Sequence, residues 1–188
     1  MCIKPLLKGT LLGGIAFFVV SCGSWMGLPF HMNSFHMFKD SPAVLKSVQE
    51  NSAENGVYML PGMTKECKEK GCQPMKFTAI VVTNPAGCNP SDMPMYMLRE
   101  FVIDLLAALL LTALLLQGKS TALKPVLKTS LLAGFILTVV AYLPNMNWWH
   151  FPLDFTLPSM IDTVVATLLA GFLIGKFALP KASADMTP

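Results

Sequence analysis

The chain has 188 residues, of which 53% are hydrophobic and only 13% are charged, about half the charged fraction of an ordinary soluble domain. A water-soluble core could not bury this much apolar surface. The net charge of +3 is too small and too dispersed to form the basic face that nucleic-acid binding needs. The composition therefore favours an integral membrane protein and indicates no nucleic-acid partner.

The apolar residues gather in four blocks, at residues 9–30, 98–118, 126–143 and 157–179. Each block has roughly the 18 to 23 residues that a helix needs to cross about 30 Å of hydrocarbon. The predicted fold class is all-α membrane, a bundle of four transmembrane helices with a small extracytoplasmic α/β cap of one helix and two strands. We expect helix 1 with a cytoplasmic N-terminus at 1–30, the cap at 31–97, helices 2–4 at 98–179 and a disordered cytoplasmic tail at 180–188.

Lysines indicate the orientation of these spans. They precede the first span, crowd the link between the second and third, and follow the fourth, whereas the link between the third and fourth has none. The positive-inside rule then places both termini in the cytoplasm and residues 31–97 and 144–156 outside. We expect a multi-pass protein of the bacterial inner (plasma) membrane. The lysines concerned are Lys4, Lys8, Lys119, Lys124, Lys128, Lys176 and Lys181.

The first span has a second interpretation at Cys22. A basic start, an apolar run and small residues before a cysteine are also typical of a bacterial lipoprotein signal, whose cleavage would leave Cys22 as a lipidated N-terminus. Apolar residues continue past Cys22 to an aromatic residue at Phe30, and this favours an uncleaved, full-length span. Small residues on this span and on the fourth, including Gly171 and Gly175, allow close approach of another helix.

The cap is predicted from local signals. Asp40 or Ser41 is a suitable N-cap, Pro42 a first helical residue, and Asn55–Gly56 an exit, so a helix of about three turns is expected. Residues 56–61 and 75–83 predict two β-strands, joined by a long charged connection, and residues 84–94 predict a loop. Two strands alone are marginal in water, so we expect them to pack on the helix, the bundle or a second copy.

Three cysteines of the cap, Cys67, Cys72 and Cys88, fall in the translocated segment, where disulfides persist. Cys67 could pair with Cys72, or either could pair with Cys88, and a structural bridge is the main interpretation. The alternative is thiol–disulfide exchange through Cys67 and Cys72, as in four-helix quinone-linked proteins. Most proteins of that type use a CxxC pair, which this chain lacks.

Acidic and aromatic residues collect near the predicted outer ends of the spans. Glu100 and Asp104 lie in the second span and Asp162 in the fourth, while His31 ends the first. The third span is followed by an aromatic segment, residues 144–152, in which Trp149 and His150 are of most interest. Because the spans alternate in direction, all of these side chains come to one level. Acids within a membrane usually face the bundle interior or a watery cavity.

The functional hypothesis is therefore a ligand-binding site at the outer rim, formed by Glu100, Asp104, His150, Asp162, His31 and Trp149. It would take a quinone, another small molecule or a proton. In the alternative interpretation, headgroup water and Arg99 satisfy Glu100, while the two aspartates cap or hydrogen-bond neighbouring helices. The histidine spacing does not favour a metal, no catalytic motif or residue is identified, and no cofactor is indicated.

Short motifs add a resemblance. Trp25-x2-Leu28-Pro29-Phe30-His31, then Gly56-x-Tyr58-x2-Pro61, resemble the patterns W-x2-L-P-[WF]-H and G-[IV]-Y-x2-P of a group of uncharacterised bacterial four-helix inner-membrane proteins. The resemblance implies a shared fold and an uncleaved first span, and no activity. The function expected from the sequence is non-enzymatic: an accessory or scaffolding component that binds membrane lipid and partner chains, or self-associates, through its small-residue helix faces.

Overall fold

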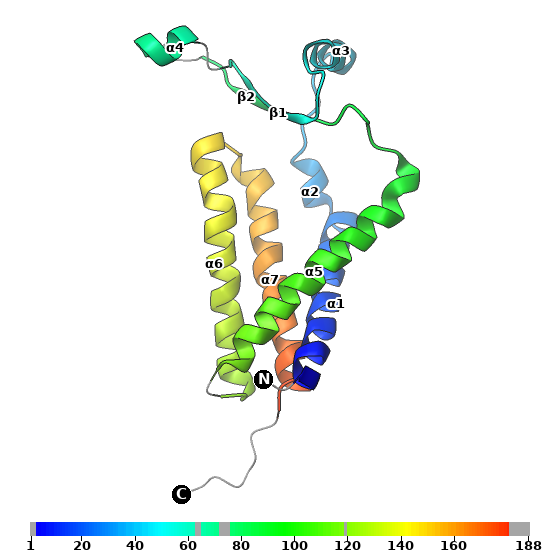
Figure 1. The fold of residues 1–188 in the computed structure, drawn as a ribbon, viewed down its shortest axis with the longest axis vertical. Coiled ribbons are helices and arrows are strands. Elements are labelled where there is room, and N and C mark those ends of the chain that lie inside the picture. Colours follow the sequence, from blue (N-terminus) through cyan, green and yellow to red (C-terminus); the bar gives the residue numbers. More distant parts are fainter. Residues whose placement is uncertain (1–2, 63–64, 72–75, 119, 181–188) are drawn as a thin grey trace, which may run out of the picture. The chain divides into compact units, whose positions relative to one another are not determined.

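The computed structural model describes residues 3–62, 65–71, 76–118 and 120–180 (Figure 1). The chain is mostly helical and separates into two compact units. The helical unit comprises Met1–Phe35 and Met93–Pro188, and the second unit comprises His36–Asp92. Each unit is described by itself below.

The helical unit contains four long helices, α1 (Ile3–Gly27), α5 (Met93–Leu116), α6 (Leu123–Trp149) and α7 (Leu153–Phe177), and the short α2 (Pro29–Asn33). Among the described residues, α1, α6 and α7 are long and apolar enough to cross a membrane. Helix α5 is equally long, but its first half carries Arg99, Glu100 and Asp104.

The long helices pack mainly in two pairs. Helix α1 lies along α5, α6 lies along α7, and α1 also packs on α7, whereas α5 and α6 make only limited contact. In Figure 1, α5 runs diagonally, with its Leu116 end near α6 and its Met93 end away from it. Helices α5 and α6 therefore diverge along the length of the unit, whereas α1 and α7 stay in contact.

Glycines allow the close approach within each pair. A Cβ added at Gly13 of α1 would lie 2.9 Å from the Cβ of Ala108 on α5, and one added at Gly171 of α7 would collide with Ser130 of α6. The glycine faces predicted to bind partner chains are thus occupied within this chain at these positions. Gly23 and Gly27 have open space beside them.

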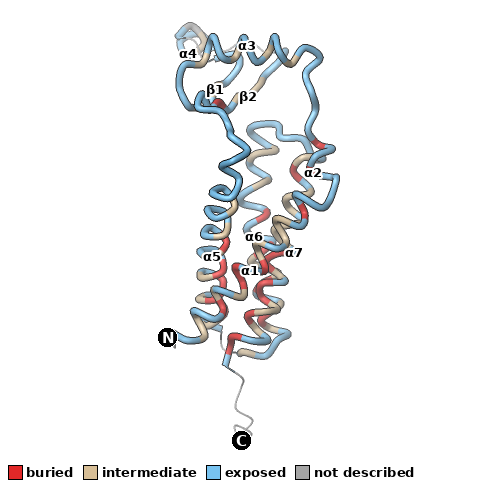
Figure 2. Tube along the Cα trace, turned by 90° about the vertical axis from the view of Figure 1, so that its right-hand side faces the viewer, coloured by how far each residue is buried: buried red, intermediate tan, exposed pale blue. Residues whose placement is uncertain are grey.

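Buried residues gather where the pairs meet, in the half of the helical unit nearer the chain termini (Figure 2). The apolar core there includes Leu111, Leu115, Val126 and Ile174. Hydroxyl side chains at the helix contacts donate to carbonyls of their own helix; for example, Ser130 Oγ donates to Val126 O over 2.9 Å. These bonds satisfy buried polar groups without a partner from another helix.

Two predicted helix boundaries need correction. The first span, expected over 9–30, is α1 followed by α2, because Leu28 precedes a proline and takes an extended conformation that breaks the helix. The third helix was expected to end at residue 143, but α6 continues through Pro144 to Trp149. The Asn145 amide donates to the Ala141 carbonyl over 2.9 Å, which satisfies one carbonyl near the proline.

The second unit contains α3 (Ser41–Asn51), β1 (Gly56–Leu60), α4 (Lys65–Lys70), β2 (Ala79–Thr83) and one 3₁₀ turn (Pro90–Asp92). Strands β1 and β2 pair antiparallel, with Tyr58 opposite Val81. The Asp40 side chain accepts from Ala43 N over 3.0 Å, so the predicted N-cap, helix and two strands are confirmed. Helix α4 was not predicted.

The contact between α7 and α6 yields a first prediction. Gly171→Ala should lower the free energy of unfolding by about 1–3 kcal/mol, because the added methyl overlaps Ser130. The measurement is unfolding by SDS in mixed micelles. Adding Ser130→Gly should restore stability, since the nearest remaining atom is Ser130 Cα at 3.9 Å.

Gly23→Ala is the matched control, because nothing lies within 4 Å of a Cβ there. Alanine favours a helix over glycine by about 1 kcal/mol, so this variant should be neutral or slightly more stable. Equal stability of Gly171→Ala and Gly23→Ala would contradict the close packing of α6 on α7.

Candidate functional site

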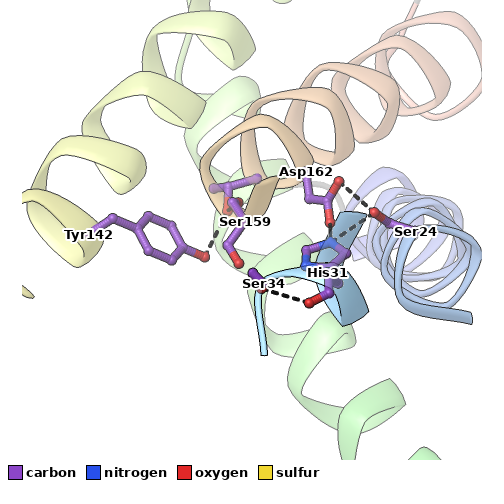
Figure 3. A network of polar contacts seen from close by, with 7 residues as sticks. Ser24, His31, Ser34, Tyr142, Ser159 and Asp162 are labelled. Carbon is purple, nitrogen blue, oxygen red and sulfur yellow. Dashed lines mark hydrogen bonds and ion pairs between the residues drawn. The ribbon is translucent and has the colours of Figure 1, made fainter. Parts of the chain in front are cut away.

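A polar clasp joins the end of the first helix to α7 (Figure 3). His31 Nε2 lies 2.8 Å from Asp162 Oδ2, and Ser24 Oγ donates to Asp162 Oδ1 over 2.8 Å. Ser24 Oγ also lies 3.0 Å from His31 Nε2. The three residues, which we call the Ser24–His31–Asp162 clasp, connect α1, α2 and α7.

Local structure positions the imidazole of His31. The break at Leu28 starts α2 at Pro29, and the Trp25 ring stacks on the imidazole at a centroid distance of 4.1 Å and an angle of 12°. Ser34 Oγ donates to the His31 carbonyl over 2.6 Å. His31 is only 2% exposed, and the Nε2 atom of its buried ring has polar partners in Asp162 and Ser24.

Hydroxyl groups join α6 to α7 nearby (Figure 3). Tyr142 OH lies 3.1 Å from Thr163 Oγ1, and Thr163 Oγ1 lies within hydrogen-bond distance, 2.8 Å, of the Ser159 carbonyl. Tyr142, Ser159 and Thr163 are polar lining residues of a cavity in the helical unit. Together with Asp162, they form a polar part of its wall that α6 and α7 contribute.

The cavity has a volume of about 630 Å³ and lies among α1, α5, α6 and α7. Its size is in the range of small-molecule sites, about 300–1,000 Å³. Acidic and hydroxyl residues line one part and aliphatic residues another. The residues concerned are Phe17, Ser21, Trp25, Glu100, Asp104, Ala107, Leu110, Leu111, Leu114, Ala133, Ile136, Leu137, Tyr142, Ser159, Asp162, Thr163, Ala166 and Thr167.

Asp104 differs from Asp162 in its surroundings. It is only 7% exposed, and its Oδ2 atom has no hydrogen-bond partner among the residues that the structure describes. A buried carboxyl oxygen without a donor is costly, by about 1–3 kcal/mol or more. Asp104, a lining residue of the cavity, therefore has one carboxyl oxygen that lacks a hydrogen-bond donor.

The structure brings four of the six predicted site residues together. Glu100, Asp104 and Asp162 line the cavity, and His31 contacts Asp162. Trp149 and His150 are not among the lining residues. Trp149 is 47% exposed in the last turn of α6, and His150 is the C-cap of that helix, with a left-handed φ of 56°.

Sequence reasoning missed Ser24 and Tyr142. Ser24 precedes His31 by seven residues, and only the helix break between them brings their side chains together. Tyr142 lies in an apolar run that gave no polar signal.

The predictions for the individual cysteines have different outcomes. Cys88 is a free, exposed thiol, so the predicted pairing of Cys88 with Cys67 or Cys72 is not formed. Cys67 is not a free thiol, and Cys72 lies outside the described residues. Cys22 is a free thiol inside the continuous helix α1.

Within the described part of the chain, no three His, Cys, Asp or Glu side chains lie close enough together to hold a metal ion. Comparisons with protein-family models, with curated proteins and with solved structures find no match to this chain.

The clasp yields a second prediction. His31→Phe retains a ring for Trp25 to stack on, and Asp162→Leu retains a side chain of similar volume. Each substitution therefore removes a hydrogen-bonding partner with little change in side-chain volume. Each single variant should lose stability, because the remaining group, buried His31 or partly buried Asp162, loses one polar partner. A double-mutant cycle of unfolding free energies should give a coupling of about 1.5–3 kcal/mol, with the double variant more stable than additivity predicts.

Lys176→Met is the control partner for Asp162→Leu. The two positions are about 21 Å apart along α7, so their effects should add. A coupling between His31 and Asp162 as small as that of the control pair would rule out the clasp.

Proposed function

We propose that this chain is a membrane protein of four spanning helices that binds a membrane-soluble small molecule in the cavity among α1, α5, α6 and α7. The apolar character of α1, α6 and α7 supports the membrane location. The proposed fourth span is α5, whose 24 residues reach about 36 Å and whose stretch from Leu105 to Leu116 is uncharged.

The acids of α5 are compatible with a span because they line the cavity. Glu100 and Asp104 are both lining residues, and Asp104 is buried. Membrane-embedded acids are least costly when they face a bundle interior or a water-filled space. This placement supports α5 as the fourth span.

The proposed orientation follows the lysines. Both chain ends and the α5–α6 link lie in the cytoplasm of a bacterium, and the unit His36–Asp92 is an extracytoplasmic cap. Because the polar part of the cavity includes Glu100 and Asp162, near the starts of α5 and α7, it lies toward the outer face in this orientation.

The observation that carries the binding proposal is the cavity itself. A half-open cavity of about 630 Å³ between the helices leaves its wall without packing partners, and that wall is polar in one part and aliphatic in another. An amphiphilic molecule matches both parts. Membrane location supplies such molecules directly from the bilayer.

A scaffolding role ranks second. It was inferred from glycine faces, and Gly13 and Gly171 contact helices of the same chain. Membership of the uncharacterised four-helix group is proposed from the motifs alone. A Cys67–Cys72 bridge is proposed from the spacing of the two cysteines.

The third prediction tests binding with Trp25, which lines the cavity. The chain has three tryptophans, so Trp148→Phe with Trp149→Phe leaves Trp25 as the sole indole. This variant is placed in nanodiscs of zwitterionic lipid and titrated with dodecyl amphiphiles brominated close to a hydroxyl, ammonium or sulfate head. At least one should quench Trp25 saturably, because bromine quenches indole fluorescence at contact.

Ala107→Phe, in the same background, fills the cavity and should abolish saturation. The neighbouring Leu106→Phe is the control, since Leu106 is 56% exposed and is not a lining residue. If quenching by all three amphiphiles rises linearly with their bilayer mole fraction, and Ala107→Phe behaves as Leu106→Phe does, the binding proposal is wrong.

A further inference from the structure

Asp104 is a lining residue of the cavity with an unsatisfied hydrogen-bond acceptor. Its side chain lines the cavity, is more than nine-tenths buried and has an Oδ2 atom without a hydrogen-bond donor among the described residues. The partly buried acid Asp162 instead receives hydrogen bonds from Ser24 and His31. The chain therefore stabilises the carboxyl group of Asp162 internally and leaves the carboxyl group of Asp104, a lining residue of the cavity, with one unpaired oxygen.

The charges of the lining residues all have one sign. Glu100, Asp104 and Asp162 line the cavity, and neither lysine nor arginine is among its lining residues in the part of the chain that the structure describes. Tyr142, Ser159 and Thr163 add hydroxyl groups. An ionised carboxylate only accepts hydrogen bonds, and a positive donor makes a charge-assisted bond to it. An anionic ligand would meet three acids without a compensating cation.

The aliphatic part of the cavity wall makes a bare inorganic ion a poor match for the cavity. Leu110, Leu111 and Leu114 of α5 and two aliphatic residues of α6, Ile136 and Leu137, line the cavity. A bare ion would leave this aliphatic wall uncovered, whereas a hydrocarbon body would fill it. The described residues also provide no cluster of three ligands for a metal.

We propose that the cavity binds a lipophilic organic cation, with a protonated amine or similar donor at Asp104 and its hydrocarbon part against the leucines of α5 and the aliphatic residues of α6. This inference rests on the proposed binding function and specifies its ligand class. Asp104 supplies the charge and hydrogen-bond acceptor for the ligand head. Asp162, already bonded within the clasp, contributes a more distant negative charge.

The fourth prediction compares three probes that differ only in the head. Brominated dodecyl amphiphiles with ammonium, hydroxyl and sulfate heads are titrated against the Trp25-only chain, with concentrations expressed as bilayer mole fractions. The ammonium probe should bind about ten-fold or more tightly than the hydroxyl probe, because one charge-assisted hydrogen bond is gained. The sulfate probe should bind most weakly.

Asp104→Asn retains the size of the side chain and removes its charge. It should bring the ammonium affinity to within about two-fold of the hydroxyl affinity and leave the hydroxyl affinity unchanged. Asp92→Asn, at an exposed acid of the second unit, is the charge-matched control and should leave all three affinities unchanged. If Asp104→Asn does not fold, Glu100→Gln at the exposed lining acid should reduce the ammonium preference instead.

The outcomes separate the two proposals. Saturable binding with equal ammonium and hydroxyl affinities, or with the sulfate probe bound most tightly, overturns the cation assignment and leaves the binding function standing. An ammonium preference that survives the acid substitution also overturns it. Absence of saturable quenching by any probe overturns both proposals.

Discussion

Close contact within two helix pairs determines the shape of the helical unit. At Gly13 the backbone of α1 comes close to Ala108 of α5, and at Gly171 the backbone of α7 comes close to Ser130 of α6. Neither contact tolerates a larger residue without movement. Helices α5 and α6 belong to different pairs and make only limited contact with each other. Their backbones therefore do not come close enough to fill the space between them. The cavity follows from the same packing that stabilises the bundle.

Asp162, which is partly buried, and Asp104, which is buried, have different relations to this packing. Asp162 is bonded to Ser24 and His31, so its carboxylate stabilises the connection between the end of the first helix and α7. Asp104 has an oxygen without such a partner at the cavity wall. Natural proteins rarely leave buried polar atoms unpaired, and the exceptions require an explanation. The proposed binding function would explain Asp104, whereas a purely structural role would be better served by an apolar residue.

Hydropathy and length predicted the long helices, and turn and cap residues predicted the small sheet and α3, because these features depend on local sequence. The alternating direction of the helices also predicted that Glu100, Asp104 and Asp162 share one level. It could not predict helix rotation, which decides that His31 bonds Asp162 while Asp104 Oδ2 has no partner. The predicted end of α6 before Pro144 was wrong, because the helix continues beyond this proline. Trp149 therefore ends the helix and is not among the residues that line the cavity.

Trp25 connects the cavity with the clasp. Its indole lines the cavity and also stacks on the imidazole of His31, which in turn contacts Asp162. A molecule in the cavity that contacts this indole therefore contacts the residue that covers the clasp. If such a molecule favours the stacked orientation of Trp25, it stabilises the clasp, and by thermodynamic reciprocity an intact clasp strengthens its binding by the same free energy. Under that condition, the residues that close the first helix onto α7 would be energetically coupled to the proposed ligand as well as to the fold.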